Sequence, residues 1–159
     1  MASTKDFFAN IRSGDLDSIK TLLKDHPDWL NVTDERGSTP LLLTTYYGHY
    51  DVAQFLVEGG AKVDAKDGSG NTALMGVCFK GYTEIAELLI KAGANVNHVN
   101  SMGATCLIYA ATFNKVDIAQ LLLSNGADVH AKDGRGNSAL DNAKMQEANE
   151  MVTLLEKYI

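Results

Sequence analysis

The sequence predicts an all-α repeat fold, a solenoid of stacked helix-turn-helix units whose connecting turns project as β-turn or hairpin fingers. The first observation is a fixed period: Gly37, Gly70, Gly103 and Gly136 follow one another at a constant step of 33 residues. The second is that apolar residues inside each block are spaced three and four apart, as on one face of a helix. A period of about 20–50 residues is typical of repeat proteins, in which neighbouring units bury one another's apolar faces.

The period divides the chain into five units that we expect to form a single domain. The 159 residues include 45% hydrophobic and 21% charged side chains, which is the composition of a folded protein. A length of 159 residues fits one compact unit. The predicted domain covers residues 1–159: an N-terminal cap repeat (1–33), full repeats at 34–66, 67–99 and 100–132, and a C-terminal cap repeat (133–159).

Charge and hydropathy argue against two classes of partner. The formal net charge is −6, and the lysines and arginines form no cluster, whereas phosphate neutralisation provides most of the affinity for nucleic acids. No stretch approaches the roughly 18 apolar residues of a membrane-spanning helix. The first residues also lack the apolar run of a secretory signal. We therefore expect a cytoplasmic protein that binds neither nucleic acid nor membrane.

The N-terminal cap repeat is predicted to consist of two amphipathic helices. Apolar stripes at positions 7–11 and 16–23 have helical spacing. The sequence Ser13-Gly14-Asp15 between them ends the first helix and gives the second an aspartate N-cap. Pro27 ends the second helix because its ring cannot continue one. We expect Trp29, which follows, to fold back as an apolar anchor.

Each full repeat is predicted to contain a polar turn followed by two helices. The turn begins with Asp or Asn and ends with Gly, which adopts the positive φ that the turn needs. Thr39, Thr72 and Thr105 then cap the first helix, and Pro40 suits the first helical position, which needs no N–H. The first helices are expected to be short, and the second helices to span 50–58, 83–92 and 116–124.

The C-terminal cap repeat copies this opening and then becomes polar. Ser138 stands where the full repeats have threonine, so a helix is expected to begin there. A second helix with Leu154 and Leu155 on its apolar face completes the unit. We expect Tyr158 and Ile159 to close the core behind it.

The motifs of these units resemble the ankyrin repeat. The resemblance covers residues 34–159 through its motifs and residues 4–33 by position. The amino-acid sequence of residues 74–82 is similar to that of bacterial members of the family. It implies an ankyrin-type solenoid. The best matches are Gly37-Ser38-Thr39-Pro40-Leu41 with Gly48-His49, Gly70-Asn71-Thr72-Ala73-Leu74, and Gly126-Ala127-Asp128-Val129.

Two departures from the family pattern affect the packing that we expect. The histidine that usually follows Thr-Pro-Leu, and ties adjacent turns together, is absent; Gly76 stands inside a predicted helix, at a cost of about 1 kcal/mol relative to alanine. We expect apolar contacts in place of the histidine network, and close approach of Tyr109 or Phe79 to Gly76. The positions of the missing histidine hold Leu42, Met75, Ile108 and Asp141.

The resemblance also implies where a partner binds. In the ankyrin family, partners bind mostly on the concave side, which the turn tips and the exposed parts of the first helices form. Matching positions in this chain are therefore expected to contact a partner. They are Glu35, Arg36, Ser38, Tyr46, Tyr47, Ser69, Asn71, Phe79, Lys80, Ser101, Met102, Thr112, Phe113, Arg135, Asn137 and Met145.

Four of these positions are aromatic, namely Tyr46, Tyr47, Phe79 and Phe113. Aromatic residues and arginine are enriched among the residues that dominate binding energy, and a row of exposed rings marks an interaction surface. The alternative is that the rings pack on one another as ordinary contacts between repeats. The two interpretations can hold together.

No group of residues in the sequence indicates catalysis, a metal or a cofactor. Cys78 and Cys106 lie in apolar helical segments, where buried free thiols are expected, and no histidine stands at a matching position to act as a base. His98 and His130 could approach each other, but two such ligands are too few for a zinc site. The Lys-Asp-Gly turns that begin at positions 66 and 132 lack the endings of phosphate and calcium loops.

The sequence therefore predicts a non-catalytic protein–protein interaction module that presents a rigid concave surface to another protein. The alternative is a structural or scaffold protein that associates with its own copies through the same surface. Enzymatic activity is the weakest hypothesis, because it would need convergent titratable groups in a deep polar pocket.

Overall fold

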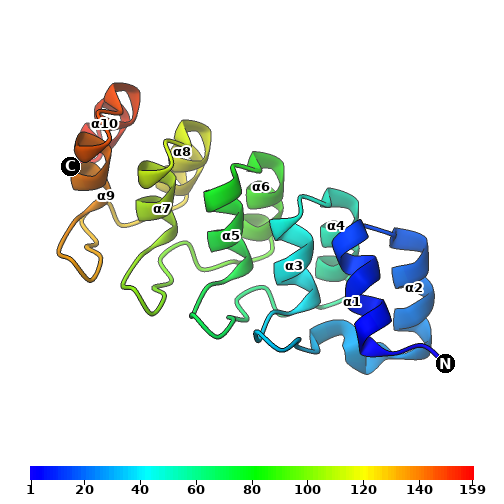
Figure 1. The fold of residues 1–159 in the computed structure, drawn as a ribbon. Coiled ribbons are helices and arrows are strands. Elements are labelled where there is room, and N and C mark those ends of the chain that lie inside the picture. Colours follow the sequence, from blue (N-terminus) through cyan, green and yellow to red (C-terminus); the bar gives the residue numbers. More distant parts are fainter.

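The computed structural model describes residues 1–159 and is all-helical, as the sequence predicts. Five helix pairs stand side by side in a row, with the two termini at opposite ends and the turns projecting from one side (Figure 1). The first helices of the pairs are α1 (Thr4–Ser13), α3 (Pro40–Tyr46), α5 (Ala73–Lys80), α7 (Cys106–Thr112) and α9 (Ala139–Met145). The second helices are α2 (Leu16–Asp25), α4 (Tyr50–Glu58), α6 (Thr83–Lys91), α8 (Val116–Ser124) and α10 (Asn149–Glu156), and a 3-10 helix, η1 (Pro27–Asn31), follows α2.

Side-chain caps begin the first helices at the predicted threonines. The hydroxyl oxygens of Thr39, Thr72 and Thr105 accept hydrogen bonds from the backbone N–H three residues later, at 3.2, 3.4 and 3.2 Å. Pro40 is the first residue of α3, where its missing N–H breaks no intrahelical bond. Asn114 follows α7 with a φ of 54°, the left-handed conformation that commonly ends a helix.

The second helices bury one apolar stripe each and join the units into one core. The predicted spans 50–58 and 116–124 are confirmed, whereas the middle helix ends at Lys91 instead of Ala92. Leu56, Leu89 and Leu122, at the same position of successive repeats, are completely buried. They belong to a hydrophobic cluster of 35 residues that continues from the N-terminal to the C-terminal cap repeat. Each unit is thus stabilised by its neighbours.

Two ladders of hydrogen bonds connect successive units. In the first, the backbone carbonyls of Arg36, Ser69 and Met102 accept from the N–H groups of the next turn, at 3.2, 3.1 and 3.0 Å. The turns therefore stay connected without the family's histidine, while Leu42, Met75 and Ile108 are buried as apolar contacts, as expected. In the second, the side-chain oxygens of Asn31, Asp64 and Asn97 accept from the backbone N–H of Lys62, Asn95 and Asp128, at 2.9, 2.9 and 2.8 Å.

The N-terminal cap repeat follows the prediction, but the end of the chain does not. The side chain of Asp15 caps α2, and the Trp29 ring folds back to lie 5.6 Å from that of Phe7. The prediction that Tyr158 and Ile159 close the core is wrong, because they are 42% and 63% exposed. Met151, Leu154 and Leu155 of α10 are buried in that part of the core instead, and the Tyr158 hydroxyl accepts a hydrogen bond from the Gln120 side chain at 3.2 Å.

No helix in the structure combines the length and the apolar character needed to cross a bilayer. The turns form no strands, and the one β-bridge joins Lys132 to Ser138.

Candidate functional site

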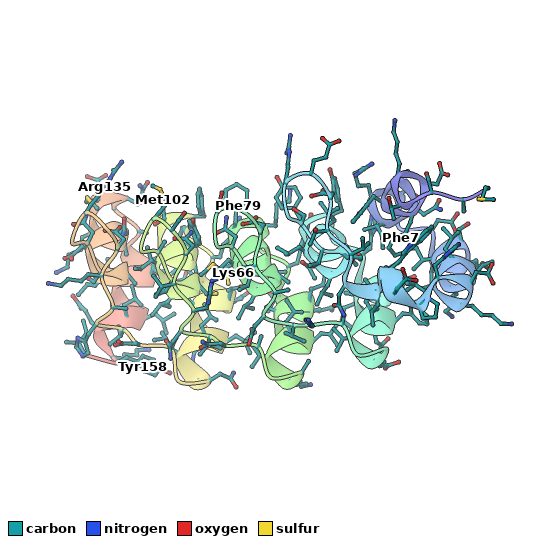
Figure 2. The ribbon with its side chains drawn as sticks, turned by 90° about the horizontal axis from the view of Figure 1, so that it is seen from below. Phe7, Lys66, Phe79, Met102, Arg135 and Tyr158 are labelled. Carbon is teal, nitrogen blue, oxygen red and sulfur yellow. The ribbon has the colours of Figure 1, made fainter.

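A groove of about 990 Å³ lies on the face made by the turns and by α3, α5 and α7. Figure 2 shows this side of the row from below, with Phe79, Met102 and Arg135 along one long edge and Tyr158 on the opposite edge. The groove is lined by Arg12, Asp34, Arg36, Ser38, Leu42, Leu43, Tyr46, Tyr47, Asp67, Ser69, Asn71, Thr72, Met75, Gly76, Phe79, Tyr109 and Phe113.

The four predicted aromatic residues all line this groove, and they are both packed and exposed. The rings of Phe79 and Phe113 meet edge to face with centroids 4.6 Å apart, and those of Tyr46 and Tyr47 do so at 5.5 Å. Each of the four side chains nevertheless keeps 41–45% of its surface exposed. Packing and exposure are thus compatible: contacts between rings orient the side chains and leave part of each ring facing solvent.

The floor of the groove contains a position without a side chain. Leu43, Gly76 and Tyr109 occupy the same place in three successive repeats, one step of 33 residues apart, and all three line the groove. A Cβ atom at Gly76 would have a single neighbour within 4 Å, Cδ2 of Tyr46 at 3.9 Å. The expected close approach of Tyr109 or Phe79 to Gly76 is therefore wrong, and the space above Gly76 is open.

Tyr109 forms one wall of the groove and is held there by Asn100. The side-chain amide of Asn100 donates to the Tyr109 hydroxyl at 2.7 Å and to Oδ1 of Asn71 at 2.8 Å. Its oxygen accepts from the N–H groups of Met102 and Ala104, both at 3.0 Å. Because Asn100 is only 7% exposed, all four bonds are shielded from water. They tie the turn, the Tyr109 wall and the preceding repeat together.

The charged side chains on the groove differ in how they are held. Oδ1 of Asp34 accepts two backbone N–H groups at 2.9 Å, and Oδ1 of Asp67 accepts two at 2.9 and 3.0 Å. The guanidinium groups of Arg12 and Arg36 are exposed and have no carboxylate partner in the chain. The ammonium group of Lys80, beside the groove, lies 4.7 Å from the centroid of the Tyr46 ring, within cation–π distance.

The structure brings half of the predicted partner-binding residues together on the groove. Those that line it are Arg36, Ser38, Tyr46, Tyr47, Ser69, Asn71, Phe79 and Phe113. Those that do not are Glu35, Lys80, Ser101, Met102, Thr112, Arg135, Asn137 and Met145. Among the latter, Met102 and Met145 are the most exposed apolar side chains, at 66% and 60%.

Sequence reasoning missed the other lining residues for identifiable reasons. Arg12 belongs to the N-terminal cap repeat, which lacks the repeat motifs. Its place is fixed by His49, whose Nε2 lies 2.8 Å from the Arg12 carbonyl oxygen. Gly76 could have been found, since it interrupts a position that otherwise holds large side chains. The sequence alone predicts Tyr109 close to that glycine, whereas the structure places it in the lining of the groove.

The cysteines and His98 lie outside the groove lining. Cys78 and Cys106 are free thiols and buried, as predicted, and burial together with a hydrogen bond that the Cys78 thiol donates to Cys106 raises the pKa of Cys78. Nε2 of His98 lies 2.9 Å from the Gly70 carbonyl oxygen, so this ring contributes to the turns. No three His, Cys, Asp or Glu side chains are placed to hold a metal ion.

Comparison with known proteins agrees with this architecture. A family model described as ankyrin repeats (3 copies) matches residues 7–100 and 63–133, which together cover most of the chain. A stretch of 62 residues is 35% identical to the ankyrin repeat and SAM domain-containing protein 6 of Mus musculus. A 62-residue stretch is also 32% identical to the putative ankyrin repeat protein YahD of Escherichia coli (strain K12). Each stretch is 39% of this chain but covers only 7% and 30% of the two relatives.

Proposed function

The chain belongs to the ankyrin repeat family, and on that premise we propose that it is a non-catalytic module that binds another protein through the groove. Ankyrin repeats are generally protein-interaction modules and are typically non-catalytic. The proposal adds the location of the contact surface in this chain. That surface consists of the residues lining the groove and the turn tips beside it.

One observation carries the proposal: four aromatic side chains, each more than two-fifths exposed, line a single groove across three repeats. Exposed apolar surface costs free energy in water, and a contiguous patch of it commonly marks an interaction site. Tyrosine is also enriched among residues that dominate binding energy. Contacts between the rings keep them in defined positions.

The backbone below the groove supports binding by a preformed surface. The threonine caps fix the starts of α3, α5 and α7, and the ladder of turn hydrogen bonds fixes the spacing between them. A surface that is already ordered loses little conformational entropy when a partner docks. We therefore expect the backbone of the groove to move little on binding.

The test is recovery of partners from the source cell with wild-type protein and with a Tyr47→Ala, Phe113→Ala double variant. These two side chains are exposed and occupy the same position of their repeats, so their loss should leave the fold intact. The matched control is Glu84→Ala, Glu87→Ala on α6, two exposed residues that do not line the groove. Mass spectrometry should find a protein retained by the wild type and the control and lost by the groove variant. A partner set identical for all three proteins would overturn the proposal.

Self-association through the same rings is the competing hypothesis, and the mass in solution separates the two. Multi-angle light scattering at micromolar concentration should give a mass near 17.1 kDa if the groove is reserved for another protein. A dimer that dissociates in a Tyr46→Ala, Phe79→Ala variant would instead assign the groove to contact between copies.

A further inference from the structure

We propose that the groove recognises a segment of a partner protein that inserts one large apolar side chain over Gly76 and places a carboxylate against Arg12 and Arg36. The inference rests on the proposed function and adds the chemistry of the partner. It is carried by two features of this chain: a missing side chain in the floor of the groove, and two arginines of the lining, Arg12 and Arg36, that have no carboxylate partner.

The gap above Gly76 lies between side chains of the neighbouring repeats, as a pocket for a single side chain would. The neighbouring repeats fill the same position with Leu43 and Tyr109, and both of these also line the groove. At Gly76 only Tyr46 comes within 4 Å of where a side chain would begin. A side chain begins at this position in both neighbouring repeats, and at Gly76 its Cβ atom would meet only Tyr46, at ordinary van der Waals distance.

The surroundings of the gap are apolar and partly unpacked. Met75, next to Gly76 in α5, is 1% exposed and forms part of the groove lining. Tyr46 and Phe79 keep 41% and 42% of their surfaces exposed. An aliphatic or aromatic side chain from a partner would cover these surfaces and remove them from water, which is the main favourable term in such contacts.

The charged residues around the gap indicate which kind of partner residue lies next to this apolar side chain. The chain carries a net charge of −6, yet the cations nearest the groove, Arg12, Arg36 and Lys80, have no carboxylate partner in the chain. The lining also contains two carboxylates, Asp34 and Asp67; Oδ1 of each accepts two backbone N–H groups of its own turn, and neither carboxylate forms a salt bridge with Arg12 or Arg36. An added carboxylate therefore finds free donors in the two guanidinium groups, which bind carboxylates in a bidentate geometry.

The probe for this proposal is a library of random dodecapeptides displayed on phage and selected on the wild-type protein. Enriched peptides should share a large apolar residue with Asp or Glu within a few positions of it. Synthetic copies of these peptides should bind more weakly as salt is raised, because the pairs with arginine are solvent-exposed. Copies in which Lys replaces the acidic residue should lose affinity further.

Two matched pairs of variants locate the contacts. Gly76→Leu fills the gap and should weaken peptide binding by about 30-fold, the effect of losing a dominant contact. Its control, Asn142→Leu, adds the same side chain at the same repeat position in α9 and should change affinity by less than about twofold. Arg36→Ala should weaken binding by about fivefold, whereas Lys91→Ala, which removes an exposed cation at the end of α6 outside the groove, should not. Circular dichroism establishes that each variant is folded.

The outcomes separate this inference from the proposed function. Enriched peptides without the apolar-acidic pattern, or peptides that bind wild type and Gly76→Leu equally, would overturn the inference. The proposed function would survive either result if those peptides lost affinity for the Tyr46→Ala, Phe79→Ala variant. Failure to enrich any peptide would also overturn the inference, because a preformed pocket for one side chain should capture short segments, and recovery from the source cell would remain the separate test of the function.

Discussion

Repeats 67–99 and 100–132 have nearly the same backbone and contribute differently to the surface. In both, a threonine caps the first helix, a turn carbonyl bonds to the next turn, and a leucine of the second helix is fully buried. Two of the many positions at which their sequences differ shape the groove and its turn. Gly76 leaves the floor of the groove open where Tyr109 builds a wall, and Asp67 stands where the other repeat has Asn100.

This difference shows that backbone geometry and surface chemistry are specified by separate residues. The turn, the caps and the buried leucines recur with the period and set the spacing of the units. The Gly76 and Tyr109 pair does not recur, and it decides where the groove has space. Asn100 links the two roles, because one side chain closes the turn and holds the Tyr109 wall.

The largest expected effect is the loss of stability when a buried leucine of either repeat is truncated, because both leucines belong to one core. Leu74→Ala and Leu107→Ala remove side chains that are each 1% exposed, so each should lower the free energy of unfolding by about 2–5 kcal/mol. The equivalent change Leu140→Ala should cost less, because Leu140 is only half-buried. Urea denaturation followed by circular dichroism measures all three. A cost for one central leucine that is several times the other would break the comparison.

Alanine substitutions at the first turn position of the two repeats should lower the free energy of unfolding by different amounts. Asn100→Ala removes four hydrogen bonds at a buried site and should cost about 2–3 kcal/mol, whereas Asp67→Ala removes two at a half-buried site and should cost about 1 kcal/mol. The same denaturation experiment measures both. NMR signals of Tyr109 should shift in the first variant and stay in place in the second. Equal costs would mean that Asn100 contributes no more than an ordinary turn residue.

A smaller effect extends the comparison to repeat 34–66. Thr44 is completely buried and its hydroxyl oxygen has no hydrogen-bond partner, while the same position of the next repeat holds Val77. Thr44→Val should therefore raise the free energy of unfolding by about 1 kcal/mol. The neighbouring Thr45 is the control, since its hydroxyl donates to the Leu42 carbonyl at 3.0 Å and Thr45→Val should not stabilise. Stabilisation by both changes would point to a general gain from valine.

The smallest expected effect is a pH dependence of stability that arises in the two cap repeats and not in the central repeats. Hydrogen bonds from the backbone and hydroxyl of Ser138 to the Asp141 carboxylate lower the pKa of this carboxyl from its ordinary value. Similar bonds from Ser3 lower the pKa of Asp6, and bonds from the side chain and backbone of Ser18 lower that of Asp15. A depressed pKa contributes stability above the unfolded pKa that is lost as pH falls through the folded pKa.

Acidification should accordingly lower the melting temperature from about pH 4 downward through loss of these end caps. The threonine caps of the central repeats do not titrate, so they should be unaffected. Asp141→Asn should make the decrease with pH shallower, whereas Asp117→Asn, at an exposed position of α8, serves as the control. An identical pH profile for wild type and Asp141→Asn would contradict the assignment.

The repeating part of the fold could be predicted because its signals are local. A threonine that caps the N–H three residues later, a proline at the first helical position and a glycine with positive φ each act within a few residues. The period then repeats these signals, so helix bounds came within one residue at α4, α6 and α8. The end of the chain has no following unit to continue the pattern, and there the expectation for Tyr158 and Ile159 failed.

What the sequence by itself determined is the stack: its units, their helices, their caps and the aromatic positions that the family resemblance assigns to a binding face. What only the tertiary structure decided is which side chains share the groove. Arg12 and Phe113 line the same groove although they are far apart in the chain, and Gly76 faces Tyr46 instead of Tyr109. The physical reason is that helix formation follows from neighbouring residues, whereas a groove depends on the direction and packing of side chains from several repeats.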